Sequence, residues 1–189
     1  ANDYATSYIP TTTATVTRSA DVCNGAGTSA EFNDSEGVLF AEISALSNDG
    51  TNRRISINDN VADDDRVLIG FSSTDNQIQG QSRTGTSTQA ALDHTVPDAT
   101  IPNKVAMKYK ANDFALWING FEVDTDGGGT APAGLIRLSF DRTAGANDFY
   151  GNTKQLMTFN QALTDSELEQ ITSWTSFSEM AKGQLYTIE

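Results

Sequence analysis

The chain has 189 residues, of which 38% are hydrophobic, so its apolar side chains suffice for one well-packed core. Fifteen glycines and frequent Thr, Ser, Asn and Asp favour short strands joined by turns over a helical or disordered chain. The net charge of −13 argues against binding to nucleic acid or insertion at an anionic membrane surface. A single cysteine, Cys23, excludes an internal disulfide.

Residues 1–20 have a β-type composition around Tyr4 and Pro10, but they show no second hydrophobic period. We interpret them as a linker or as the terminal strand of a preceding module, and residues 21–189 as one domain. The segment resembles an element that recurs before jelly-roll domains in phage tail and other multidomain proteins. The chain is therefore expected to be the C-terminal piece of a longer protein, with neighbouring domains as partners.

Strands can be predicted from residue 37 onward, where runs of residues with high β-propensity alternate with Asn, Asp and Gly. The predicted strands are 38–46, 53–57, 66–72, 77–83, 89–96, 104–110, 114–119, 121–124, 135–141 and 150–159. A spacing of about ten residues without intervening helices predicts an all-β antiparallel β-sandwich. The Asn119-Gly120 pair predicts a hairpin with a type I′ turn.

The end of the chain predicts one or two short helices. Thr164 and Glu167 have the spacing of a capping box, and Leu163 and Leu168 fall at the two staple positions. A second capping box is predicted at Ser176 and Glu179.

Residues 149–168 also resemble the closing signature of the laminin-G-like and pentraxin-like jelly rolls of the concanavalin A-like superfamily. The matching residues are Gly151, Leu156, Phe159, Asn160, Ala162, Leu163, Thr164, Glu167 and Leu168. Residues 115–120 are similar to the "LYVNG" hairpin of the same family, and Thr153 and Thr158 stand where the family has branched aliphatic core residues. The resemblance covers residues 37–175 and implies a jelly roll of the kind found in phage tail and marine bacterial proteins.

Catalytic chemistry is poorly supported by the residues. Glu122, Asp124 and Asp126 are similar to the acidic strand of jelly-roll glycoside hydrolases, where two carboxyl groups about 5 Å apart would allow a retaining mechanism. Three glycines follow directly, which favours a solvated hairpin end. The sole histidine, His94, lacks a nucleophile motif, and Gln77-Ile78-Gln79 lacks the histidine of the jelly-roll lyases.

Calcium is a possible ligand of the acidic loops, because hard oxygen donors gather in several turns. These turns contain Asn48-Asp49, Asp63-Asp64-Asp65, Asp124, Asp126 and Asn147-Asp148. None has the spacing of an EF-hand, so solvated turns are favoured and no metal ligand is assigned. One cysteine and one histidine cannot build a structural zinc site.

Side-chain alternation indicates where a sugar could bind. Val105 and Met107 share one strand face, which leaves Lys108 on the other, and Arg54 likewise alternates with Ile55. Sugars need flat aromatic surface and fixed polar groups, which strand side chains supply. We predict one cationic, amide-rich outward face as the ligand-binding surface, with the loop tips as the alternative site. The residues predicted to form this face are Arg54, Gln79, Gln81, Arg83, Lys108, Trp117 and Arg137.

The sequence therefore leads to three hypotheses. The first is a non-catalytic, lectin-like carbohydrate-binding module that attaches a larger protein, such as a phage tail or adhesin-type assembly, to a glycan outside the cell or on a virion. The second is a structural module that packs on neighbouring subunits through its edge strands and binds no sugar. The third is a polysaccharide hydrolase or lyase of the same fold.

Overall fold

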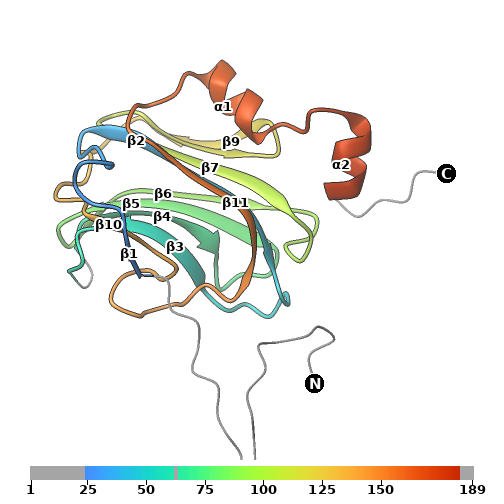
Figure 1. Ribbon diagram of the computed structural model, residues 1–189, viewed down its shortest axis with the longest axis horizontal. Helices are drawn as coiled ribbons and strands as arrows, with labels where there is room; N and C mark the ends of the chain where they lie inside the picture. Colours follow the sequence, from blue (N-terminus) through green and yellow to red (C-terminus); the bar gives the residue numbers. More distant parts are fainter. Residues whose placement is uncertain (1–23, 62–63, 184–189) are drawn as a thin grey trace, which may run out of the picture.

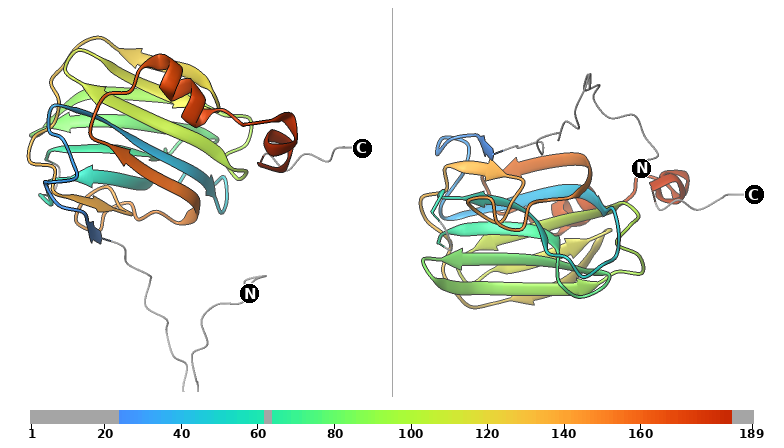
Figure 2. Two further views of the ribbon diagram at one scale, coloured as in Figure 1. Left: turned by 45° about the horizontal axis from the view of Figure 1, so that its top comes forward. Right: turned by 90° about the horizontal axis from the view of Figure 1, so that it is seen from below.

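Two antiparallel sheets pack face to face in the computed structural model, which describes residues 24–61 and 64–183 (Figures 1 and 2). The sequence prediction of an all-β antiparallel sandwich is confirmed. The predicted N-terminal segment, residues 1–20, lies outside the described residues, as do Cys23 and Asp63.

All ten predicted strands are present, and one short strand, β1, was not predicted. The six-stranded sheet has the order β1 (Asn24–Ala26), β10 (Arg137–Ser139), β3 (Arg53–Asn58), β4 (Arg66–Phe71), β5 (Gln77–Thr84) and β6 (Ser87–Thr95). The five-stranded sheet has the order β11 (Gly151–Phe159), β2 (Glu36–Ala45), β7 (Asn103–Lys110), β8 (Phe114–Ile118) and β9 (Phe121–Asp126). β10 is shorter than predicted because the N–H groups of Gly134 and Leu135 donate to the carboxylate of Asp34 instead of a neighbouring strand.

The main core lies between the sheets and follows the predicted alternation. Ile55 and Ile57 of β3 and Val105 and Met107 of β7 belong to this core, and all four are fully buried. Burying these side chains supplies the main driving force for the fold. On edge strand β11, Thr153 pairs with Ile43 of β2 and Thr158 pairs with Leu39. Both threonines are half-buried on the core side of the sheet.

A second core lies on the outer face of the five-stranded sheet, where helix α1 (Asp165–Thr172) packs over β7, β8 and β9 (Figure 1). Leu168 of the helix packs among Phe40, Ala106 and Trp117. The chain then turns into α2 (Phe177–Gly183), where the Glu179 N–H donates to Ser176 Oγ at 3.1 Å. Both predicted helices are confirmed, and no helix among the described residues has the length and apolarity needed to cross a bilayer.

The capping box of α1 forms as predicted. The Glu167 N–H donates to Thr164 Oγ1 at 3.4 Å, and the Thr164 N–H donates to Glu167 Oε2 at 2.8 Å. The Thr164 N–H and the Thr164 hydroxyl both donate to Glu167 Oε2, and these two hydrogen bonds hold the pKa of Glu167 below its usual value. The helix start is thus fixed by local chemistry that can be read from the sequence.

Replacing Thr164 with alanine removes the cap and is expected to lower the free energy of unfolding by about 1 kcal/mol. Urea denaturation followed by tryptophan fluorescence would measure the change, since Trp117 lies under the helix. Ser166→Ala, inside the first turn, is the matched control and is expected to leave the midpoint nearly unchanged. Equal midpoints for the Thr164 variant and the parent would contradict the capping role.

Candidate ligand-binding face

The outer face of the six-stranded sheet gathers polar side chains into three rows that run across its strands. In the first row, Arg137, Asn58, Arg66 and Arg83 are successive partners on β10, β3, β4 and β5. In the second row, Ser139, Ser56, Leu68, Gln81 and Ala91 are successive partners. In the third row, Arg54, Gly70, Gln79 and Asp93 are successive partners. We call these rows the arginine face.

The arginine face concentrates positive charge on a protein that is otherwise acidic. Seven arginines occur in a chain whose net charge is −13, and four of them lie in these rows. Neighbouring strands are about 5 Å apart, so the rows span a width of about 15 Å. Such a face attracts an anionic ligand despite the net charge of the whole chain.

Arg54 is the most constrained of the charged groups. Its guanidinium Nη2 donates to Asn52 Oδ1 at 2.8 Å and to Gln79 Oε1 at 2.6 Å, and the side chain is 6% exposed. Burial and the nearby guanidinium groups of Arg142 and Arg66 lower the pKa of Arg54 to about 10, whereas Asp93 acts to raise it. Arg54 is therefore charged at neutral pH in surroundings that disfavour its charge, which an anion would relieve.

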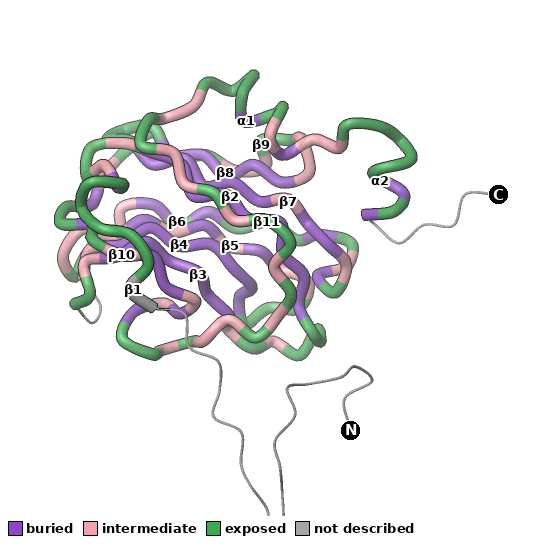
Figure 3. Tube along the Cα trace, viewed as in Figure 1, coloured by how far each residue is buried: buried purple, intermediate pink, exposed green. Residues whose placement is uncertain are grey.

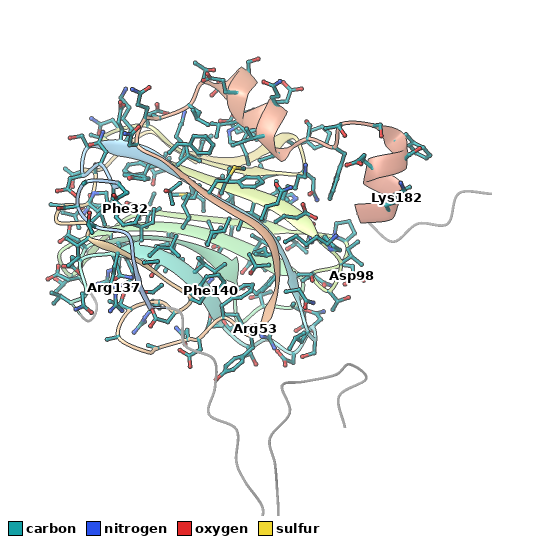
Figure 4. The ribbon with its side chains drawn as sticks, viewed as in Figure 1. Phe32, Arg53, Asp98, Arg137, Phe140 and Lys182 are labelled. Carbon is teal, nitrogen blue, oxygen red and sulfur yellow. The ribbon has the colours of Figure 1, made fainter. Side chains whose placement is uncertain are left out.

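The other arginines are held by neighbouring polar groups. Arg137 Nε donates to Asn58 Oδ1 at 3.1 Å, and Arg66 Nη2 donates to Gln81 Oε1 at 3.3 Å. Arg83 Nη2 donates to the Thr86 carbonyl. Figure 3 shows β3 and β4, which carry Arg54 and Arg66, as buried throughout. In Figure 4, Arg137 marks one end of β3 and Arg53 the other.

The loop from β10 to β11 closes over one side of this face. Its two ends are fixed by aromatic packing, with Phe149 6.1 Å from Phe71 and 6.0 Å from Phe140 between ring centroids. The Arg54 N–H donates to the Asn147 carbonyl at 3.0 Å, which ties the loop to β3. Asp141, in this loop, is 4% exposed and accepts from the Gly145 N–H at 2.8 Å.

Buried polar atoms on this side that make no hydrogen bond within the part of the chain that the structure describes include Arg54 Nη1, Arg83 Nε, Ser139 Oγ and Asp141 Oδ1. Buried polar groups normally have partners, because an unsatisfied one costs about 1–3 kcal/mol. A cationic donor, a hydroxyl and a carboxylate acceptor together suit a ligand that carries both an acid group and hydroxyls.

Five of the seven predicted ligand-binding residues lie together on the arginine face. They are Arg54, Gln79, Gln81, Arg83 and Arg137. Lys108 and Trp117 face outward as predicted, but they belong to the opposite sheet, so placing them on the same surface was wrong. Trp117 is 6% exposed beneath α1, and Lys108 Nζ pairs with Asp113 at 2.6 Å. The helix needs an apolar surface to pack on, and Trp117 supplies it.

Glu122 and Asp124 of the acidic strand β9 do not share a face of the sheet. A β-bulge places Asp124 opposite Leu116 and Glu122 opposite Trp117, so these two acids point to opposite faces of the sheet. Asp124 Oδ2 accepts from the Asp93 N–H at 3.0 Å, and Asp126 Oδ1 accepts from the Gly128 N–H at 2.9 Å. Their roles are to close the edge between the sheets and to shape a turn.

Many loop acids likewise accept backbone N–H groups. Asp65 accepts from Gly85 at 3.1 Å and from Ala133 at 2.7 Å. One carboxylate oxygen from each of Asp59, Asp64 and Asp65 lies within 4.8 Å of the other two, and the three could hold a cation. Burial, the Asp65 side chain and the charge of Asp59 raise the pKa of Asp64. Several of the loop acids therefore cap turns by accepting backbone N–H groups.

Arg66, Asn58 and Asp93 also belong to the arginine face, although the sequence alone did not indicate them. Arg66 is 1% exposed, and it shares its strand face with Leu68 and Gly70, so the strand reads as apolar on both faces. Strand register would have identified it, because Arg66 is the partner of Arg83. Register depends on turns and on the facing core, so a single strand does not reveal it.

Comparison with known proteins shows the fold. No protein-family model matches the chain, and no curated protein matches it. Among solved structures, the CBM40 module of the Ruminococcus gnavus IT-sialidase is similar, with a TM-score of 0.64 at 16% identity over 79% of this chain and 94% of that one. The same module bound to α2,3-sialyllactose gives 0.62 at 16% identity over the same shares.

Two further structures extend this likeness. A heptameric SAP-like pentraxin from Limulus polyphemus has a TM-score of 0.62 at 12% identity, covering 82% of this chain and 76% of that one. The leech intramolecular trans-sialidase gives 0.60 at 20% identity, with 84% of this chain matched to 27% of the enzyme. The chain thus has the β-sandwich fold of these modules and spans about a quarter of the enzyme.

Proposed function

We propose that the chain is a non-catalytic glycan-binding module whose arginine face takes an acidic sugar. The observation that carries the proposal is the set of buried, unsatisfied groups formed by Arg54 Nη1, Ser139 Oγ and Asp141 Oδ1, beside the row of Arg137, Arg66 and Arg83. A guanidinium binds a sugar carboxylate through charge-assisted hydrogen bonds. The hydroxyl and the carboxylate satisfy ring or glycerol hydroxyls next to it.

The likeness to the CBM40 module, which has been solved with sialyllactose, supports this proposal and suggests sialylated glycans as the first ligands to test. The opposite orientations of Glu122 and Asp124 support a non-catalytic role. In this proposal the module acts outside the cell or on a virion, where it attaches a larger phage tail or adhesin-type protein to an acidic glycan.

A binding experiment with matched ligands tests the proposal. Isothermal titration of the protein with α2,3-sialyllactose, α2,6-sialyllactose and neutral lactose is expected to show binding to one or both acidic sugars and none to lactose. Glucuronic acid oligosaccharides test a second class of sugar acid. Equal binding in millimolar calcium and in chelator is expected, because the face is cationic. Absence of binding to every acidic glycan would favour a structural module and overturn the proposal.

The pH dependence of binding follows from Arg54. Its guanidinium is charged below its pKa of about 10 and loses its proton above that value. Affinity for an acidic sugar is therefore expected to stay flat from about pH 6 to 9, where Arg54 and the sugar carboxylate are both ionised, and to fall as the pH rises through 10. Titrations at pH 7, 9 and 10.5 would measure it, with circular dichroism confirming that the protein remains folded. Unchanged affinity at pH 10.5 would contradict the role of Arg54.

A further inference from the structure

We infer that Asp93 and Gln79 are positioning residues that hold the Arg54 guanidinium in its ligand-binding orientation. This inference rests on the proposed function and deepens it. Asp93, which is exposed, lies on edge strand β6 and carries a negative charge at the border of a face proposed to bind an acid. Charge repulsion alone would make the Asp93 carboxylate unfavourable for binding an anionic ligand.

Two hydrogen bonds connect Asp93 to Arg54 through the side chain of Gln79. Asp93 Oδ1 accepts from Gln79 Nε2 at 2.8 Å, and Gln79 Oε1 accepts from Arg54 Nη2 at 2.6 Å. Asp93 thereby fixes which end of the Gln79 amide faces Arg54: the Nε2 group must point to the carboxylate, so the oxygen points to the guanidinium. With the amide reversed, Gln79 would present N–H groups to a cation that accepts no hydrogen bond.

The strand register makes the connection possible. Asp93, Gln79, Gly70 and Arg54 are partners in one row, and Gly70 has no side chain to separate its two neighbours. Gln79 can therefore reach across β4 to Arg54. The chain of contacts is anchored at its far end, where the Asp93 N–H donates to Asp124 Oδ2 of the opposite sheet at 3.0 Å.

The result for the site is a guanidinium that is fixed before the ligand arrives. Nη2 is held by Gln79 and Asn52, which leaves the buried Nη1 without a partner among the described residues. Arginine otherwise has many rotamers, and ordering one on binding weakens affinity. A fixed Arg54 avoids that loss.

Substituting Asp93 separates positioning from electrostatics. Asp93→Ala removes a negative charge near the site, so charge effects alone predict tighter binding of an anion. Positioning predicts the opposite, and we expect α2,3-sialyllactose, or whichever acidic glycan the parent binds best, to bind about five- to tenfold more weakly. Asp93→Asn retains an oxygen for Gln79 Nε2 without the charge and is expected to bind at least as tightly as the parent.

A second variant removes the hydrogen bonds of Gln79, which lies between Asp93 and Arg54. Gln79→Met keeps the length of the side chain but removes both hydrogen bonds, and it is expected to show the same loss as Asp93→Ala. The double variant is expected to be no weaker than either single one, because both act through Arg54. The Asp93 backbone contact to Asp124 persists in all of these variants, and thermal melting would verify their folding.

The outcomes distinguish this inference from the proposed function. If the parent binds no acidic glycan, the proposed function fails. If the parent binds and Asp93→Ala binds equally or more tightly, or if Asp93→Asn loses affinity as much as Asp93→Ala, the positioning role is overturned while the proposed function stands.

Discussion

Replacing Arg54 with alanine is expected to weaken binding of an acidic glycan roughly 100-fold, the largest effect of any single side chain on the arginine face. Arg54 is buried, tied to two partners, and provides a guanidinium nitrogen without a partner among the described residues. Truncation removes a charge-assisted hydrogen bond to the ligand and leaves the Gln79 oxygen without its donor. Titration calorimetry of the parent and the variant would measure the change.

Two further variants make the result specific. Arg54→Lys keeps the charge but loses the planar donor set, so an intermediate loss of about tenfold is expected. Lys110→Ala changes the net charge by the same amount on the five-stranded sheet, where Lys110 Nζ pairs with Glu36 at 2.9 Å. It is expected to bind like the parent. Equal losses for Lys110→Ala and Arg54→Ala would mean that the overall charge, and not this face, controls binding.

Replacing Gly70 with alanine is expected to lower the free energy of unfolding by about 3 kcal/mol or more. Gly70 has φ +152°, and a Cβ atom there would lie 1.9 Å from the carbonyl oxygen of Arg53, with its carbonyl carbon at 3.0 Å. The obstacle is backbone in the middle of the sheet, so relief requires β3 and β4 to separate. Urea unfolding would measure the loss.

Gly127→Ala is the matched control for this substitution. Nothing lies within 4 Å of a Cβ atom at that position, and a midpoint close to that of the parent is expected. Gly70→Ala is also expected to weaken glycan binding where it remains folded, because it disturbs the strand between Arg54 and Gln79. Unfolding midpoints that are equal for Gly70→Ala and the parent would show that the sheet accommodates the methyl group.

Local chemistry made several features predictable from the sequence. The Asn119-Gly120 hairpin was predictable because Asn and Gly tolerate the positive φ angles of a type I′ turn. In the structure these angles are +52° and +90°. The capping box of α1 depends on two residues three positions apart. Strand alternation, a property of each strand by itself, correctly assigned Arg54 and Arg137 to outward faces.

The sequence could not show which strands are neighbours, because strand pairing depends on how the whole chain folds into two packed sheets. Alternation showed that Lys108 and Trp117 face outward, but not that they belong to the sheet that α1 covers. The spacing of Glu122 and Asp124 predicted that both side chains share one face of the strand. In the structure a β-bulge in β9 turns them to opposite faces.

The sequence by itself determined the fold class, the helix start and the direction of individual side chains, because each depends on residues that are near one another in the chain. The tertiary structure alone decided that Arg54, Gln79 and Asp93 form one connected set, since they come from three strands. It also decided that Arg66 joins Arg83 and Arg137. Such a site depends on register across a sheet, which the hydrophobic core and the turns set together.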